Sequence, residues 1–185
     1  MAESNDRDPM GSADASDDGW AVQSLFHFIV NASNFERSLA FYRALGFKLL
    51  RDNRDVIWPS MVAENFGMPV AQGRGALLAI GEGETHTRID LIEWLEPKWE
   101  DPARSLPPER YVPRVMALRT RNVRAAYREL KAKGIEFIGE PRERDPSIGL
   151  ESVVCCRDPD GLVVELIEYM PGVLGSRIES LARRE

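Results

Sequence analysis

The chain carries an internal repeat, and this feature constrains its fold more than any other. Each half contains a short apolar segment, then a helical pattern with a capping asparagine, then a glycine that closes the helix. Three residue pairs share one offset of 88 residues: His27 and Val115, Asn34 and Asn122, and Gly46 and Gly134. A fixed internal period indicates a duplicated supersecondary unit. The sequence therefore predicts two equivalent modules that face each other.

Each half has the pattern of a strand, a helix and three further strands. In the first half, Ser33 to Glu36 form a capping box at the helix start, and Gly46 stands where a left-handed C-terminal cap belongs. Short runs of branched and aromatic residues on either side are typical of strands. The expected strands are 25–31, 47–51, 75–80 and 88–94 in the first half, and 114–120, 135–138, 150–156 and 162–169 in the second.

Both halves close with an acidic strand, and these two strands hold the candidate functional carboxylates. The sequences are IDLIE over 89–93 and VELIE over 164–168. Side chains alternate between the two faces of a strand, so Asp90 and Glu165 are expected to point inward. Glu93 and Glu168 then fall on the opposite face, near the strand ends, where we expect them to be solvated. With His27, the two inward carboxylates are candidates to meet between the modules.

Composition places the chain among ordinary globular proteins. It has 185 residues, of which 43% are apolar and 29% are charged. A net charge of −6 argues against a dedicated nucleic-acid binder. No apolar run is long enough to span a membrane. The adjacent Cys155 and Cys156 are expected to be small buried residues in a reducing compartment, and together with the lack of a secretory signal they predict a cytoplasmic location.

Changes in composition along the chain predict its organisation. Residues before Gly19 are acidic and rich in serine, and a cluster of prolines separates the two modules. The expected segments are a disordered tail over 1–19, a first module over 20–96, a linker over 97–113, a second module over 114–170, and a C-terminal helix or tail over 171–185.

The repeat and two local motifs resemble one known superfamily. The motifs are FERSLAFYRALGF over 35–47 and the turn RDPDG over 157–161, which is followed by Val164, Glu165 and Leu166. With the repeat, they resemble the vicinal oxygen chelate superfamily, which includes glyoxalase I, methylmalonyl-CoA epimerase, extradiol dioxygenases, and the fosfomycin and bleomycin resistance proteins. The resemblance covers residues 25–169. It implies an α+β fold with two tandem βαβββ modules that form an open, cupped, barrel-like sheet.

The resemblance also implies positions for metal ligands, in the first and last strands of both modules. These positions are His27, Asp90, Val115 and Glu165. Valine cannot bind a metal, so three ligands remain, with open positions for water or substrate. One nitrogen and two carboxylates suit Zn²⁺, Mn²⁺, Fe²⁺, Ni²⁺ or Mg²⁺. The alternative is a metal-free polar cavity in which His27 hydrogen-bonds one carboxylate.

The first functional hypothesis is a lyase, isomerase or epimerase that moves a proton next to a carbonyl group of a small oxygenated substrate. Glu165 and Asp90 would act as base and ligand. Ring cleavage is disfavoured, because extradiol dioxygenases place a second histidine at the position of Val115. We also expect a homodimer. The residues expected to bind substrate are Asn31, Trp58, Val115 and Arg119.

The rival hypothesis is a non-catalytic protein that sequesters a ligand, as the bleomycin resistance members do. Such proteins use an apolar, aromatic-lined cleft. The irregular segment over 58–75 supplies Trp58, Met61, Phe66 and Met68 for one. A third possibility is a function within a partner complex, with the basic stretch over 104–144 as the contact surface.

Overall fold

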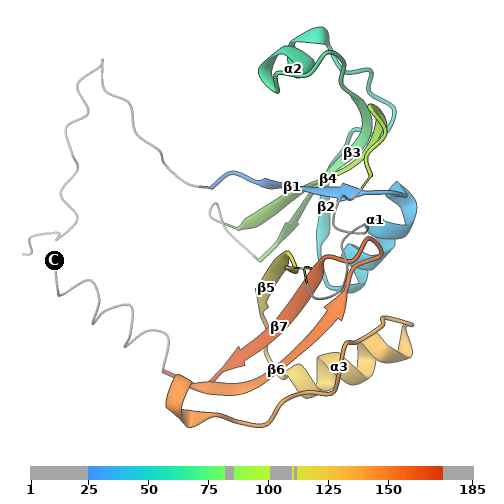
Figure 1. Ribbon diagram of the computed structural model, residues 1–185. Coiled ribbons are helices and arrows are strands. Elements are labelled where there is room, and N and C mark those ends of the chain that lie inside the picture. The colour runs from blue at the N-terminus through green and yellow to red at the C-terminus, as the bar shows by residue number, and fades with distance from the viewer. Residues whose placement is uncertain (1–24, 82–85, 101–109, 111, 173–185) are drawn as a thin grey trace, which may run out of the picture.

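The structure is a computed structural model that describes residues 25–81, 86–100, 110 and 112–172. The tail expected over 1–19, most of the linker (101–109 and 111) and the segment 173–185 lie outside the described residues. Figure 1 shows the two modules one above the other, with α1 and α3 on the same side. No helix among the described residues is long and apolar enough to cross a membrane.

The first module is a four-stranded sheet with two helices. In chain order its elements are β1 (Phe28–Ala32), α1 (Phe35–Ala44), β2 (Lys48–Asp52), α2 (Ser60–Asn65), β3 (Gln72–Ile80) and β4 (Thr87–Glu96). The strand order is β1-β4-β3-β2, with β1 parallel to β4 and the other pairs antiparallel. Helix α2 lies within the segment 58–75, which the sequence had indicated as irregular.

The second module repeats this plan with one strand fewer. Its elements are β5 (Val115–Arg119), α3 (Val123–Ala132), the 3-10 turn η3 (Pro146–Ile148), β6 (Leu150–Arg157) and β7 (Val163–Tyr169). The strand order is β5-β7-β6, and β5 runs parallel to β7. The prediction of a strand over 135–138 is wrong, because this segment forms an isolated bridge between Phe137 and Cys156. After the bond from Ile138 N to Cys155 O, pairing with β6 is interrupted at Gly139 and resumes only at Arg142, which bridges Val153.

The repeat extends to the hydrogen bonds at the helix starts. The Asn34 side chain accepts from Arg37 N at 2.9 Å, and the Asn122 side chain accepts from Ala125 N at 3.0 Å. A glutamate of the last strand then accepts from the first helical N–H in each module. These bonds are Phe35 N to Glu93 Oε2 and Val123 N to Glu168 Oε2, both 2.9 Å.

The expectation that Glu93 and Glu168 are solvated is therefore wrong. A helix start leaves backbone N–H groups without partners and carries partial positive charge. A carboxylate that projects from the sheet towards the helix satisfies both requirements. Each glutamate thus ties its helix to the last strand of its own module.

A turn of the second module joins the two modules. The Tyr42 hydroxyl, on α1, donates to Asp158 Oδ2 at 2.9 Å. Asp160 Oδ2 accepts from Ser33 N at 3.0 Å and from Ser38 Oγ at 3.3 Å. Both aspartates are buried, and Tyr42 is fully buried. We name this set of contacts the Asp158–Asp160 latch.

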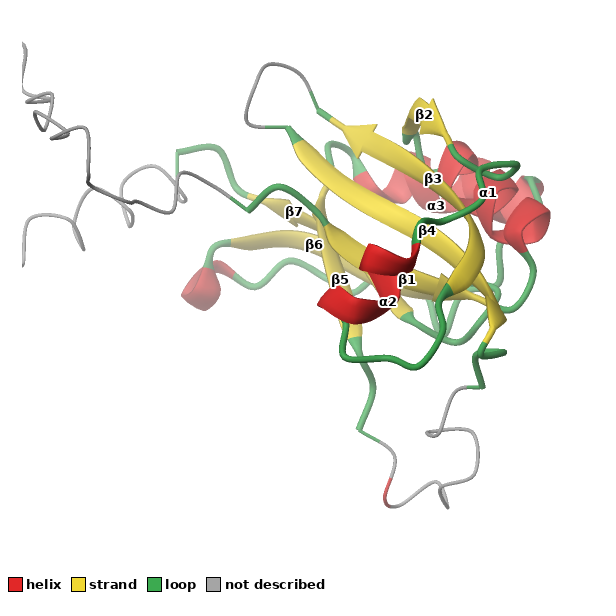
Figure 2. Ribbon diagram, turned by 90° about the horizontal axis from the view of Figure 1, so that it is seen from above, coloured by secondary structure: helices red, strands yellow, loops and turns green. Residues whose placement is uncertain are grey.

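One continuous core runs beneath both sheets. It contains residues of both modules, including Val30, Tyr42, Met116 and Cys156. The sheets themselves do not close into a barrel, because no strand pairing joins them in the described part of the chain. Figure 2 shows both sheets curving around a common concave side. The α+β fold of two facing modules in an open, cupped arrangement is confirmed.

Candidate functional site

Strand alternation divides the side chains of β4 between the core and the concave face. Ile89 and Leu91 are fully buried in the core. Asp90 and Ile92 lie on the opposite face and line a cavity there, and Trp94 continues the same face. Arg51 of β2 pairs with Leu77 of β3, and Leu77 pairs with Asp90 of β4. These three side chains therefore lie in a row across the same face of the sheet. The concave face of the first sheet therefore carries the carboxyl group of Asp90, the guanidinium group of Arg51 and the indole of Trp94.

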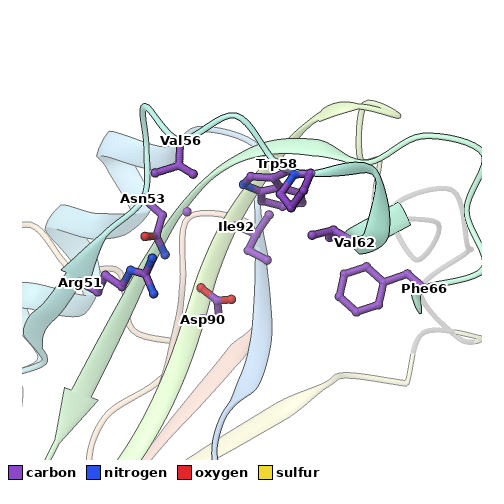
Figure 3. Close-up of a pocket in the computed structure, with 10 residues that line it drawn as sticks. Arg51, Asn53, Val56, Trp58, Val62, Phe66, Asp90 and Ile92 are labelled. Carbon is purple, nitrogen blue, oxygen red and sulfur yellow. The ribbon is translucent and has the colours of Figure 1, made fainter. Parts of the chain in front are cut away.

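The cavity on this face has a volume of about 220 Å³. It lies between the sheet and the segment that leads into α2, as Figure 3 shows. Polar and apolar side chains lie on different sides of the cavity, and strands of the sheet contribute to both sides. The residues that matter most are Arg51, Asn53 and Asp90 on the polar side, and Trp58, Phe66 and Ile92 on the apolar side. We name this space the β4 cavity.

Trp58 is held over the sheet by a glycine and a glutamine of β3. The Gln72 side chain accepts from Trp58 N at 3.3 Å and donates to Trp58 O at 3.0 Å. A Cβ atom at Gly73 would lie 2.9 Å from the Trp58 ring, so the absent side chain makes room for the indole. Trp94 meets Trp58 edge to face, with ring centroids 5.3 Å apart. Phe66 lies against Trp94 in the same manner at 6.3 Å.

Gly75 forms the floor of the β4 cavity between Asp90 and Ile92. A Cβ atom there would lie 3.8 Å from Asp90 Oδ1 and 3.9 Å from Ile92 Cγ1, which are ordinary contact distances. A methyl group therefore fits the fold and occupies cavity space. The spacing of Gly73 and Gly75 removes two side chains from one face of one strand. Glycine inside a strand often marks a close approach of another group.

We expect Gly75→Ala to leave the melting temperature unchanged or slightly raised, because alanine loses less conformational freedom on folding than glycine. The same change should weaken, by about tenfold, the binding of any molecule that lies against this floor, since overfilling a tightly packed site costs about 1–3 kcal/mol. Calorimetric titration and thermal unfolding measure the two effects. A variant that binds as tightly as the wild type would show that the ligand lies elsewhere. The matched control is Gly139→Ala, whose added Cβ meets nothing within 4 Å.

The electrostatics of Asp90 distinguish it from an ordinary surface acid. Burial raises the pKa of this carboxyl group, while electrostatic interaction with His27 and Arg51 acts in the opposite direction. Within the part of the chain that the structure describes, neither carboxylate oxygen has a hydrogen-bond or ion-pair partner. A partly desolvated acid without a partner inside a cavity is a candidate functional group.

The structure brings some of the residues expected to be metal ligands together and leaves one apart. His27 precedes β1 and lies close enough to Asp90 to influence its pKa. Its Nδ1 atom is buried and makes no hydrogen bond to the described residues. Glu165 lies on the other sheet, where it is the ladder partner of Cys155. Val115 is 55% exposed on β5.

The donor set therefore does not fit a metal ion held by one chain. Among the described residues there is no group of three or more His, Cys, Asp or Glu side chains that could hold a metal. His27 and Asp90 supply two candidate donors, and a catalytic site usually has three protein ligands. The assignment of His27, Asp90 and Glu165 as ligands stays a prediction.

Of the residues expected to bind substrate, one lines the β4 cavity and others lie elsewhere. Trp58 lines the β4 cavity. Asn31 lines a separate cavity beside Trp94, and its Oδ1 atom accepts from Trp94 Nε1 at 2.9 Å, so its expected contact with substrate stays a prediction. Arg119 is exposed on β5 and does not line the β4 cavity. Sequence reasoning missed Arg51 and Asn53, and the glycine spacing at 73 and 75 was the signal that could have located the cavity floor.

Comparisons with known proteins identify the family. A family model described as the Glyoxalase/Bleomycin resistance protein/Dioxygenase superfamily matches residues 24–166. A search of curated proteins finds no match.

Three solved structures are similar to this chain in fold. A glyoxalase family protein from Bacillus cereus has 14% identity and a TM-score of 0.65, covering 84% of this chain and 99% of its own. TnmS3, an antibiotic binding protein from a Streptomyces species, has 24% identity and a TM-score of 0.52, covering 82% and 99%. A mutant of the fosfomycin resistance protein FosX from Listeria monocytogenes, complexed with Mn(II) and a dihydroxypropylphosphonic acid, has 14% identity and a TM-score of 0.52, covering 86% and 99%. At these identities the likeness extends to the fold alone.

Proposed function

The chain belongs to the Glyoxalase/Bleomycin resistance protein/Dioxygenase superfamily, and from this premise we propose that it binds a flat, mainly apolar organic molecule in the β4 cavity. One observation carries the proposal. An aromatic wall of Trp58 and Phe66 faces an unpartnered, partly buried acid, Asp90, across an open space. Small-molecule sites are typically apolar pockets with a few polar groups that fix orientation.

The polar side of the β4 cavity specifies what the ligand should carry. An ionised Asp90 accepts hydrogen bonds, so the ligand needs a hydroxyl or N–H donor. The guanidinium of Arg51 donates only, so the ligand also needs a carbonyl or phenolic oxygen. The side-chain amide of Asn53 both donates and accepts, so it can bond to either of these ligand groups. A ring system with one donor and one acceptor on its edges meets these requirements, and 7-hydroxychromone is a simple probe of this chemistry.

A second candidate function is proton transfer next to a carbonyl group, with Asp90 and Glu165 in the acid and base roles. The observation that favours it is the raised pKa of Asp90, since groups with perturbed pKa values gather at catalytic sites. On this hypothesis Asp90 holds or moves the proton while Arg51 stabilises the developing oxyanion.

The expected homodimer and metal site belong with this second candidate. Ile29 and Val115 lie on the concave side and are 36% and 55% exposed. Apolar side chains on an open face suit contact with a second copy. A second copy is also one way for Glu165 to approach His27 and Asp90. Sedimentation and zinc titration of the full chain test the two ideas separately.

The experiment that separates the two functions compares binding and turnover. Calorimetry with 7-hydroxychromone should show binding by the wild type, unchanged binding by Glu165→Gln, and weaker binding by Asp90→Asn. Turnover is followed with small 2-oxo, 2-hydroxy and acyl-thioester compounds. If the wild type converts one of them and Glu165→Gln loses about 10²–10⁴-fold in rate, the enzyme hypothesis replaces the binding proposal.

We expect Asp90 to make ligand binding depend on pH. Its raised pKa means that binding through the ionised carboxylate weakens as pH falls through that raised value. The 7-hydroxyl of the probe is conjugated with its ring carbonyl and is more acidic than the tyrosine phenol, so the ionisation of the free probe is measured at each pH and subtracted. Titrations of 7-hydroxychromone from neutral to acidic pH should show this loss in the wild type, and a weaker, pH-independent affinity in Asp90→Asn. Removing a hydrogen bond to a charged group should weaken binding by about tenfold to a hundredfold at neutral pH.

The same shift predicts the effect of Asp90→Asn on stability. A raised pKa in the folded state means that the folded protein binds more protons than the unfolded chain between the ordinary and the raised value. Stability is therefore lost as pH rises through that window. At neutral pH, Asp90→Asn should raise the melting temperature, and the difference should vanish in acid. An equal or lower melting temperature at neutral pH would contradict the desolvation argument.

A further inference from the structure

A second cavity lies beside the β4 cavity, beyond Trp94. It has a volume of about 490 Å³, against about 220 Å³ for the first. Its walls come from β1, from Met68 after α2, from Trp94, and from the segment 97–100, which contains Trp99. Backbone contact between Leu95 and Lys98 folds this segment back, which places Trp99 at the same cavity as Trp94. We name it the Trp99 cavity.

Trp94 is the shared boundary of the two cavities. It lines the Trp99 cavity, and its ring lies edge to face against Trp58 and Phe66, which line the β4 cavity. Its orientation is fixed, because its indole N–H donates to Asn31 Oδ1 at 2.9 Å. An indole N–H can only donate, so the Asn31 oxygen must face it.

The distance along β4 from Asp90 to Trp94 gives the length of the path from the polar end of the β4 cavity to the Trp99 cavity. Asp90, Ile92 and Trp94 alternate onto the same face of the strand. A strand rises about 3.3 Å per residue, so Asp90 and Trp94 are about 13 Å apart along it. This span exceeds a single ring system and suits two linked rings.

The chemistry of the Trp99 cavity favours an aromatic group of low net charge. Trp94, Trp99, Met68 and Ile29 provide ring faces and apolar surface. Tryptophan rings and a thioether both contact aromatic groups favourably. Lys98 and Glu100 line the same cavity with opposite charges, so their effects on a charged group oppose each other.

We propose that the Trp99 cavity is a second subsite, and that the ligand is an elongated molecule of two linked aromatic ring systems. One ring system bears the donor that meets Asp90 in the β4 cavity. The other passes Trp94 and contacts Trp99. This inference rests on the proposed function, because it assigns the size and shape of the molecule that the β4 cavity binds.

The test uses two probes that differ by one phenyl ring, 7-hydroxychromone and 7-hydroxyflavone, titrated calorimetrically into the full chain. The flavone should bind about tenfold more tightly, the gain expected from one further aromatic contact. Trp99→Ala should remove this advantage and leave chromone binding unchanged. The control Ile138→Ala, which alters a side chain that is 51% exposed in the second module, should change neither affinity.

The outcomes separate the two proposals. If the chromone binds and the flavone binds no more tightly, the second subsite is wrong and the β4 cavity proposal stands. The same holds if Trp99→Ala weakens both probes equally with its melting temperature unchanged. If neither probe binds, both proposals fail. If Trp99→Ala does not fold, Met68→Ala takes its place, with the same expected loss of the flavone advantage.

Discussion

Replacing Asp158 by alanine is expected to lower the free energy of unfolding by about 3 kcal/mol, because each buried donor left without a partner costs about 1–3 kcal/mol. Asp158 accepts from the Tyr42 hydroxyl at 2.9 Å, from Asp160 N at 2.9 Å and from Leu162 N at 2.8 Å. Alanine leaves all three donors unpaired at a site where Asp158 is only 5% exposed. The loss stays well below the sum of three such costs, because burial raises the pKa of Asp158 and alanine relieves that desolvation.

Thermal unfolding followed by circular dichroism measures this effect. A loss of this size lowers the melting temperature of a chain of this length by about 6–12 °C. Asp158→Asn is the matched variant, since its amide oxygen still accepts and its shape is nearly the same, so its loss should be smaller. Asp55→Ala removes an exposed acid and should change little. A melting temperature of Asp158→Ala equal to the wild type would show that the Asp158–Asp160 latch does not hold the modules together.

Replacing Trp58 by alanine is expected to weaken 7-hydroxychromone binding by about a hundredfold, the loss of about 2.7 kcal/mol typical of a central aromatic contact. Trp58 lines the β4 cavity over Gly73 and meets Trp94 edge to face. Its removal therefore takes away the ligand contact and also one support of Trp94. Calorimetry measures the affinity, and the Trp58 indole is partly exposed, so a smaller change is expected in stability than in binding.

The neighbouring Ile57 provides the control. It is 86% exposed and does not line the β4 cavity. Ile57→Ala changes an apolar side chain of the same segment, so it should leave probe affinity unchanged. A hundredfold loss in both variants would indicate that the whole segment, rather than the Trp58 ring, determines binding.

The repeat predicted most of the architecture, because strand and helix periodicity are local properties of the chain. The helix starts at Asn34 and Asn122 follow from capping preferences that involve three or four neighbouring residues. The inward direction of Asp90 follows from alternation alone. The strand expected over 135–138 contacts β6 only through isolated bridges, at Phe137 and again at Arg142, which residue propensity alone does not distinguish from a continuous strand.

The roles of several polar residues depended on contacts that no local pattern contains. Strand alternation placed Glu93 and Glu168 on the face expected to be solvated. Each instead accepts a hydrogen bond from the first backbone N–H of the helix in its own module. The aspartates of the turn at 158–160 had the composition of a tight turn, yet they accept hydrogen bonds from Ser38 and Tyr42 of α1 across more than a hundred residues of sequence. The hydrogen bond by which the Asn31 side chain orients Trp94 likewise joins residues 63 positions apart.

By itself, the sequence determined the family, the two modules, the capped helices and the concave position of Asp90, because period, propensity and capping act between near neighbours. Tertiary structure alone decided which side chains share a cavity. It placed Asp90 with Trp58, Arg51 and Gly75, and it left Glu165 on the other sheet. The physical reason is that a site depends on how two curved sheets are positioned relative to each other. That position is set by buried contacts such as the Asp158–Asp160 latch, whose partners are distant in sequence.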